Sequence, residues 1–271
     1  SILNCDEFED ITSTISTGDF SLAANTQVKI NILGRIYTFY SPYTQIVNYE
    51  IVNNLLNLSA NNTTITSKDD VNDYLKIVGN SNNINIKNGN DSLIVEGNDN
   101  TINATTGNKN FQVVGDNNTY NGSSGINTVL VNGNSNRILG GESADIINIQ
   151  SGSDNSIMGN DGDDIITISS ANNNVYGGDG KDTIIMDASN SASYTIDGGS
   201  GDDLIYIKGS SSTGLINGGS GNDEIVVTGS DNTNIATGSG NDSIINQGNN
   251  NAFVNSGGND VINEEGSSVL T

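Results

Sequence analysis

The sequence predicts an all-β fold, a solenoid in which short parallel strands stack coil upon coil. A repeat of about 18 residues runs through most of the chain, and each repeat holds two stretches of alternating apolar residues separated by glycine-rich or asparagine-rich turns. Only 33% of the residues are hydrophobic and 5% are aromatic, which is too little for a thick globular core. Stacked coils need only a thin core, because each coil buries its apolar residues against its neighbours.

The repeat appears first as a column of polar residues that follow the turns. Successive members are 18 to 21 residues apart. They are Asp73, Asp91, Lys109, Asn127, Asp145, Asp164, Asp182, Asp203, Asp223, Asp242 and Asp260. Two residues after each member stands a large apolar residue, such as Ile147 after Asp145, and usually another follows two residues later. This period of two predicts a short strand with one buried face.

A second strand precedes each of these turns. Seven residues before a member of the polar column stands an apolar residue, such as Ile157 before Asp164, and two residues before that stands an asparagine in most repeats. Each coil therefore holds two strands and two turns, one rich in glycine and aspartate and the other in asparagine. We expect about 11 coils of ~18 residues, in a parallel β-roll or β-helix.

Residues 1–58 lack the repeat, and we expect them to form an irregular amino-terminal cap. Residues 28–40 alternate and predict a pair of strands, whereas residues 44–58 place Ile51, Leu55 and Leu58 at helical spacing and predict a short amphipathic helix. An irregular first coil is the alternative. A solenoid needs such a cap because its terminal coil exposes open strand edges.

The remaining chain divides by the composition of its turns. Residues 59–139 are expected to form asparagine-rich coils, residues 140–265 glycine–aspartate coils, and residues 266–271 a tail.

The charge is strongly negative and unevenly distributed. The chain has 32 acidic residues against nine Lys and Arg, a net charge of −23. From Gly140 onward there are 19 acids and two bases, Lys181 and Lys208. An ordered segment of this kind repels itself unless cations lie among its carboxylates. The charge argues against nucleic acid as a partner, and no apolar run of roughly 18 residues predicts a membrane span.

The residue types restrict the chemistry further. The chain has no His and a single cysteine, Cys5. We therefore expect no Ser–His or Cys–His catalysis and no zinc or copper site, and we expect that the protein is not an enzyme. Glycine permits positive φ, so a glycine turn directs its carbonyl oxygens toward one point. Stacking brings equivalent turns within about 4.8 Å of each other. Carbonyl and carboxylate oxygens in this arrangement suit calcium, which takes about six to eight oxygen ligands.

Three nine-residue segments carry a resemblance to a known family. "GGDGKDTII" (177–185), "GGSGDDLIY" (198–206) and "GGSGNDEIV" (218–226) match in full the nonapeptide of RTX, or haemolysin-type, calcium-binding repeats. Residues 159–167 and 237–245 match it less one glycine, and residues 140–148 and 255–263 match more loosely. The resemblance implies a parallel β-roll with calcium between adjacent turns, bound by the motif aspartates and by carbonyls of the glycine turns.

Carried over position by position, the resemblance implies one row of metal ligands along one edge of the coils. They are Gly140, Asp145, Gly159, Asp161, Gly162, Asp164, Gly177, Asp179, Gly180, Asp182, Gly198, Ser200, Gly201, Asp203, Gly218, Ser220, Gly221, Asp223, Gly238, Gly240, Asp242, Gly257 and Asp260. Seven stacked turns would hold roughly six calcium ions. Lys109 and Asn127 interrupt the row and leave Asp73 and Asp91 as isolated candidates.

These expectations lead to a functional hypothesis. The resemblance implies a calcium-binding module of a secreted bacterial protein that folds outside the cell, where calcium is near millimolar, and supports type I secretion of an attached toxin, protease, lipase or adhesin. The alternative is a structural or adhesive cell-surface repeat that binds surface glycans.

Overall fold

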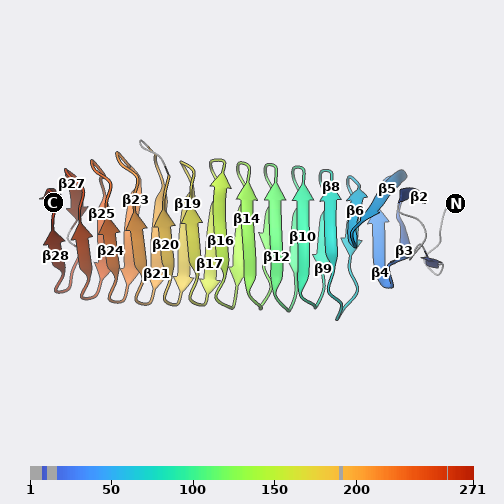
Figure 1. The fold of residues 1–271 in the computed structure, drawn as a ribbon, viewed down its shortest axis with the longest axis horizontal. Helices are drawn as coiled ribbons and strands as arrows, with labels where there is room; N and C mark the ends of the chain where they lie inside the picture. The colour runs from blue at the N-terminus through green and yellow to red at the C-terminus, as the bar shows by residue number, and fades with distance from the viewer. Residues whose placement is uncertain (1–7, 11–16, 189–191, 255) are drawn as a thin grey trace. The chain divides into compact units, whose positions relative to one another are not determined.

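The computed structural model describes residues 8–10, 17–188, 192–254 and 256–271 (Figure 1). Within these ranges every regular element is a strand, and no helix has the length and apolar character needed to cross a bilayer. The chain divides into two compact units, Ser1–Gly125 (unit 1) and Ile126–Thr271 (unit 2).

Unit 2 consists of eight two-stranded coils in its described residues. Even-numbered strands form one sheet and odd-numbered strands the other, and each strand pairs in parallel with the strand two further along the chain. The strands are β14 (Asn127–Asn132), β15 (Arg137–Gly141), β16 (Ile146–Ser151), β17 (Ser156–Asp161), β18 (Ile165–Ile168), β19 (Asn174–Asp179), β20 (Thr183–Met186), β21 (Thr195–Ser200), β22 (Leu204–Ile207), β23 (Leu215–Ser220), β24 (Glu224–Val227), β25 (Ile235–Ser239), β26 (Ser243–Asn246), β27 (Asn251–Val254), β28 (Val261–Glu264) and β29 (Ser268–Leu270).

The register of these strands aligns the two apolar columns. Ile147 pairs with Ile166, and the same column continues through Ile184 and Ile205 to Ile262. The facing column runs from Ile138 in the same manner. Apart from the last coil, these side chains are buried. The core is one layer of aliphatic side chains between the two sheets, as the alternation predicts.

Unit 1 contains four parallel coils in its described residues. Their strands are β6 (Leu55–Ser59), β7 (Thr64–Thr66), β8 (Tyr74–Val78), β9 (Asn83–Ile86), β10 (Asp91–Glu96), β11 (Thr101–Ala104), β12 (Lys109–Val114) and β13 (Thr119–Asn121). The two units together give about 12 coils, so the predicted fold class is confirmed. The additional coil begins at Leu55, inside the segment that we expected to be a cap.

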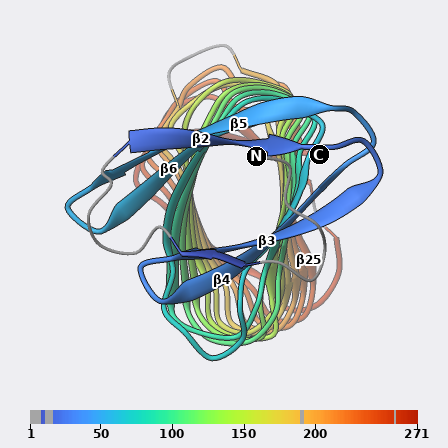
Figure 2. The same cartoon turned by 90° about the vertical axis from the view of Figure 1, so that its right-hand side faces the viewer.

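In the described residues, five strands precede the coils of unit 1, and all but the first belong to antiparallel pairs (Figure 2). They are β1 (Phe8–Asp10), which pairs in parallel with β3, and β2 (Thr17–Leu22), β3 (Thr26–Ile32), β4 (Arg35–Ser41) and β5 (Gln45–Val52). The alternating stretch 28–40 lies in the β3–β4 hairpin. β4 pairs with β7 and β5 with β6, so antiparallel strands continue both sheets of coils.

The prediction of a short helix within residues 44–58 is wrong. This stretch forms the antiparallel strands β5 and β6, joined at Asn53 and Asn54, whose φ values are 51° and 65°. Two consecutive asparagines with positive φ form the tight turn that matches the twist of a hairpin. Leu56 and Leu58 are buried, at the alternate positions of a strand.

Candidate cation sites

In most coils the two turn edges are built on the same hydrogen-bond pattern. At the asparagine edge, the backbone N–H of Asn155 donates to Oδ1 of Asn173 in the next coil at 2.9 Å. The Asn155 side-chain Nδ2 donates to the Gly133 carbonyl, also at 2.9 Å. Equivalent pairs recur along both units. Each of these amides therefore uses its oxygen and its nitrogen between coils.

The aspartate edge repeats the first half of this pattern. The backbone N–H of Asp145 donates to Oδ1 of Asp164 at 2.7 Å, and that of Asp164 donates to Oδ1 of Asp182 at 2.8 Å. The ladder continues to Asp260. Its aspartate residues from Asp145 to Asp242 are at most 2% exposed. The predicted aspartate column is thus a buried ladder, and Asp260, in the last turn, is half-buried.

The second half of the pattern is missing at this edge, because a carboxylate has no N–H to donate. The Oδ2 atoms of six ladder residues in unit 2 are buried without a hydrogen-bond partner: Asp145, Asp164, Asp182, Asp203, Asp223 and Asp242. A buried, unpartnered carboxylate oxygen is costly. Because six such oxygens lie at equivalent positions, this energetic cost recurs in coil after coil along the aspartate edge.

Five of these Oδ2 atoms, all but that of Asp242, face a second acceptor across a small gap. The point where a Cβ of Gly177 would stand lies within 3.0 Å of both Asp182 Oδ2 and the Gly198 carbonyl oxygen of the next coil. The first glycines of four other turns repeat this arrangement: Gly140, Gly159, Gly198 and Gly218. Two facing acceptors need a positive group or a proton between them, and a glycine is required beside them because a side chain would fill the gap.

The burial of these carboxylates changes their acidity. Loss of solvation raises the pKa of Asp164 from its ordinary value of 3.8 to about 7, and the neighbouring carboxylates of Asp182 and Asp145 add to the increase. Burial likewise raises the pKa of Asp145, Asp182, Asp203 and Asp223 to about 6. At neutral pH, the charged ladder therefore opposes folding unless cations compensate it.

Asn127 shows what a neutral amide does at the same ladder position. Its backbone N–H donates to Asp145 Oδ1 at 2.6 Å, as in the rest of the ladder. Its Nδ2 donates to the Gly140 carbonyl at 3.1 Å. Gly140 O is the equivalent of the carbonyl that faces Oδ2 in the aspartate coils. The amide supplies the donor that the carboxylates lack.

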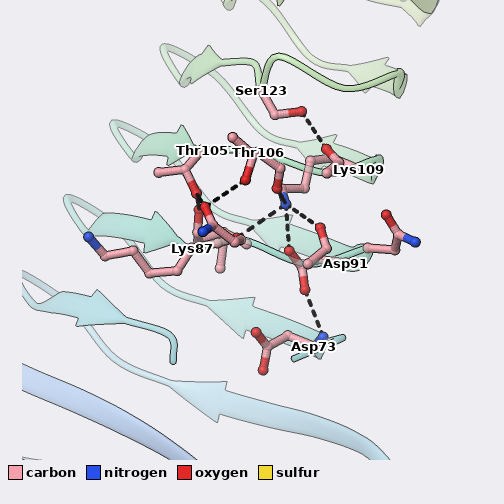
Figure 3. Close-up of polar contacts among 12 residues, drawn as sticks. Asp73, Lys87, Asp91, Thr105, Thr106, Lys109 and Ser123 are labelled. Carbon is pink, nitrogen blue, oxygen red and sulfur yellow. Dashed lines mark hydrogen bonds and ion pairs between the residues drawn. The ribbon is translucent and has the colours of Figure 1, made fainter. Parts of the chain in front are cut away.

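Lys109 shows that a cation fits between two turns of this edge (Figure 3). Its Nζ lies 2.7 Å from Asp91 Oδ2, and both side chains are buried. The same Nζ donates to three carbonyls, of Gly89 at 2.6 Å, Thr106 at 2.8 Å and Lys87 at 3.2 Å. Four oxygens from two successive turns therefore surround one positive charge.

The turns of unit 2 present equivalent oxygens. The Gly89 N–H donates to Thr106 O, and the Gly162 N–H donates to Asp179 O in the same way. By this correspondence, the carbonyls of Asn160, Gly162 and Asp179 are the candidate partners of Asp164 in a cation site, equivalent to the carbonyls around Lys109. The sets that follow use the carbonyls of Gly178, Gly180 and Ser200 with Asp182, of Gly199, Gly201 and Ser220 with Asp203, and of Gly219, Gly221 and Ser239 with Asp223.

The predicted third-position residues offer their backbone carbonyls, not their side chains, to the candidate sites. The side chains of Asp161, Asp179 and Ser220 are exposed, and Ser200 Oγ donates to Asp179 Oδ1 at the surface. Sequence reasoning missed the second-position carbonyls, such as that of Asn160, and also Gly258. In the last turn it is Gly258 that stacks on Gly240, whereas a Cβ on Gly257 would meet no atom within 4 Å. The offset of two residues before Asp260 would have identified Gly258.

The donor set fits a hard cation. Within the described part of the chain no three Asp, Glu, His or Cys side chains gather into a metal cluster, so each candidate site combines one buried carboxylate with main-chain oxygens. Calcium accepts such carbonyl-rich sites and completes its shell with water. Comparison with models of known protein families, with curated proteins and with solved structures gives no match to this chain.

Proposed function

We propose that this chain is a calcium-binding β-roll module of the RTX type, in which unit 2 binds roughly six calcium ions in one row. The observation that carries the proposal is the series of six buried Asp Oδ2 atoms without a hydrogen-bond partner. Each of these aspartates is followed by another turn, so an ion between the two turns would give roughly six sites. The full nonapeptides at 177–185, 198–206 and 218–226 support the same assignment.

Calcium fits these sites better than other common cations. Zinc and copper favour His and Cys ligands, and the chain has no His and one Cys. Magnesium holds its water and requires a strict octahedron, which a row of flexible glycine carbonyls does not impose. A divalent ion also offsets more of the charge of unit 2, in which 19 acids stand against Arg137, Lys181 and Lys208.

Binding at these sites is coupled to folding. Without cations, the ladder carboxylates repel each other and lose their hydration when the coils stack. Because the sites exist only in stacked coils, the free energy of binding becomes free energy of folding. Modules outside the cell bind calcium at about 0.1–1 mM. The module would stay unfolded where calcium is scarce and fold after export, in support of type I secretion of an attached effector.

A calcium titration tests this proposal. We expect roughly six ions per chain by isothermal calorimetry, with a cooperative gain of β-structure by circular dichroism between chelator and about 1 mM calcium. Magnesium, sodium and potassium at the same ionic strength serve as controls. Absence of calcium binding, or an equal response to a monovalent ion, would overturn the assignment.

A second candidate, an adhesive surface repeat, is favoured by one feature of the outer sheet face. Thr183, Ile185, Leu204, Tyr206 and Lys208 line a shallow groove of about 320 Å³, and the Lys208 ammonium lies 5.6 Å from the centre of the Tyr206 ring. A tyrosine face beside polar groups suits a sugar ring. Binding to a glycan array that is lost in Tyr206→Ala would support this function. An array without any hit would exclude it for the glycans tested.

A further inference from the structure

We infer that unit 1 carries its own cation at the aspartate edge: the Lys109 ammonium takes the place between two turns that a metal ion takes in unit 2. The coils of unit 1 then close without metal. The inference deepens the proposed function and rests on it for the comparison with unit 2. Its first support is the contact set of Nζ, which joins one carboxylate oxygen and three carbonyl oxygens.

The position of Lys109 distinguishes it from an ordinary surface lysine. Lys109 occupies the ladder place held by aspartate in other coils, and its side chain runs back along the stack toward Asp91 (Figure 3). The side chain of Lys109 is 4% exposed and that of Asp91 is 2% exposed. A buried ammonium is tolerated only when its protons are satisfied. Here three N–H groups meet four oxygens from two turns.

The first carboxylate of the row also has protein partners. Asp73 Oδ1 accepts a hydrogen bond from the Tyr37 hydroxyl at 2.5 Å. The Arg35 Nε lies 3.9 Å from the same oxygen and donates to the Asn72 carbonyl at 2.9 Å. Asp73 Oδ2 accepts no hydrogen bond. Burial raises the pKa of Asp73, and the Arg35 charge near Oδ1 offsets part of this increase. Strand β4 thus supplies the first turn with a hydroxyl and a guanidinium.

In the described residues of unit 2, the ladder carboxylates have no basic side chain as a partner. Among its described residues, the ion pair that forms is Lys208 with Asp187, and neither belongs to the ladder. From Asp145 to Asp242 no basic side chain in the described ranges lies within ion-pair distance of a ladder carboxylate. The two units therefore differ in the source of positive charge. Removal of metal should open the coils of unit 2 and leave those of unit 1 folded.

Removal of the ammonium should convert the Lys109 position into a metal site. Lys109→Ala leaves Asp91 Oδ2 and the three carbonyls around a space without a cation, which calcium can enter from solution. Lys109→Met removes the charge and keeps a long apolar side chain in that space, so no ion can enter. Asp91→Asn combined with Lys109→Met removes both charges and leaves an amide at the ladder position, as at Asn127.

Hydrogen exchange of the full chain, measured by mass spectrometry, tests these differences. The exchange is carried out once in chelator and once in about 1 mM calcium, the concentration range in which extracellular modules bind. In the natural chain, peptides of β10–β13 should be protected in both conditions, and peptides of β18–β25 only with calcium. In Lys109→Ala, exchange in β10–β13 should rise at least about tenfold in chelator and return with calcium. Lys109→Met should show the rise in both conditions, and the double variant should show it in neither.

The controls separate this inference from the proposed function. Lys68→Ala, at an exposed lysine of the same unit, should leave exchange unchanged. If Lys109→Met matches the natural chain, or if calcium protects Lys109→Met as well as Lys109→Ala, the inference is overturned. If calcium fails to protect β18–β25 in the natural chain, the proposed function fails. In that case, comparing hydrogen exchange in the double variant with that in Lys109→Met still tests whether Lys109 compensates the buried Asp91 charge.

Discussion

Replacement of Asp203 by asparagine should stabilise the metal-free protein, although Asp203 is a proposed calcium ligand. The substitution keeps the size of the side chain and the Oδ1 atom that accepts the Asp182 N–H at 2.8 Å. It exchanges the buried, unpartnered Oδ2 for an NH₂ group that faces the Gly218 carbonyl. Asn127 makes the corresponding bond to Gly140 at 3.1 Å. The new amide should do the same.

The expected gain follows from the acidity of Asp203. Burial raises its pKa from 3.8 to about 6, and one pKa unit corresponds to about 1.4 kcal/mol. At pH 7.5 the charged carboxylate therefore costs up to about 3 kcal/mol of folding free energy. A neutral amide avoids this cost. The bond to the Gly218 carbonyl should add about 1 kcal/mol.

Urea unfolding at pH 7.5 in chelator measures this gain, with an osmolyte in all samples to bring the metal-free natural chain into its folded state. Calorimetry in calcium should show one ion fewer than in the natural chain, because the carboxylate of that site is gone. Asp202→Asn is the matched control: Asp202 is exposed, and its Oδ1, which accepts the Asn222 N–H, is kept. A metal-free Asp203→Asn protein that unfolds at lower urea than the natural chain would refute the reasoning.

Three further predictions concern the rest of the fold. Because folding raises the pKa of five ladder carboxylates in unit 2 from 3.8 to about 6 or 7, the folded state binds more protons than the unfolded state between these values. Stability in chelator, measured by urea unfolding, should be highest near pH 4 and fall as pH rises through 6 to 7; a rise over that interval would contradict the shifts. Gly201→Ala should cost more than about 2 kcal/mol in thermal unfolding, because φ is +132° and the Cβ would strike a carbonyl of the preceding coil. Gly34→Ala, at φ +77° with open space around it, should cost about 1 kcal/mol. Asn173→Ala should cost about 2–4 kcal/mol in urea unfolding, because the Asn155 N–H loses its acceptor; a loss confined to chelator would show that the asparagine edge also depends on metal.

The repeat made the core and the strand register predictable. Residues two positions after the polar column pair directly across coils, as Ile147 does with Ile166, because a fixed period and a buried face leave one register. The first coil and the hairpin before it were not predictable from the same signal. The spacing of Ile51, Leu55 and Leu58 suits a helix as well as two short strands, and only the positive φ of Asn53 and Asn54 identifies the turn between them.

The positions of the candidate ligands were predictable, but their division of labour was not. The sequence places Asp164 and Asp182 in successive turns, yet it does not reveal that one oxygen of each carboxylate is occupied by a backbone N–H and the other is not. That split depends on how coils stack. Lys109 was interpreted as an interruption of the row for the same reason: its spacing does not show whether the ammonium points to solvent or back along the stack to Asp91.

Where asparagine holds one edge and aspartate the other, the two edges differ in one atom per coil, and that atom decides whether the coil is complete on its own. At the asparagine edge the atom is an amide nitrogen, and the Asn155 Nδ2 finds a carbonyl. At the aspartate edge the backbone ladder is the same, but Oδ2 meets an acceptor, so a donor or a cation must come from elsewhere. The chain meets this requirement with the amide of Asn127 in one coil and with the ammonium of Lys109 in another. Since both act at equivalent ladder positions, the need for positive charge arises from the stacking of the coils. Exchange of Asp, Asn and Lys along this column should therefore move metal dependence from coil to coil without a change of fold.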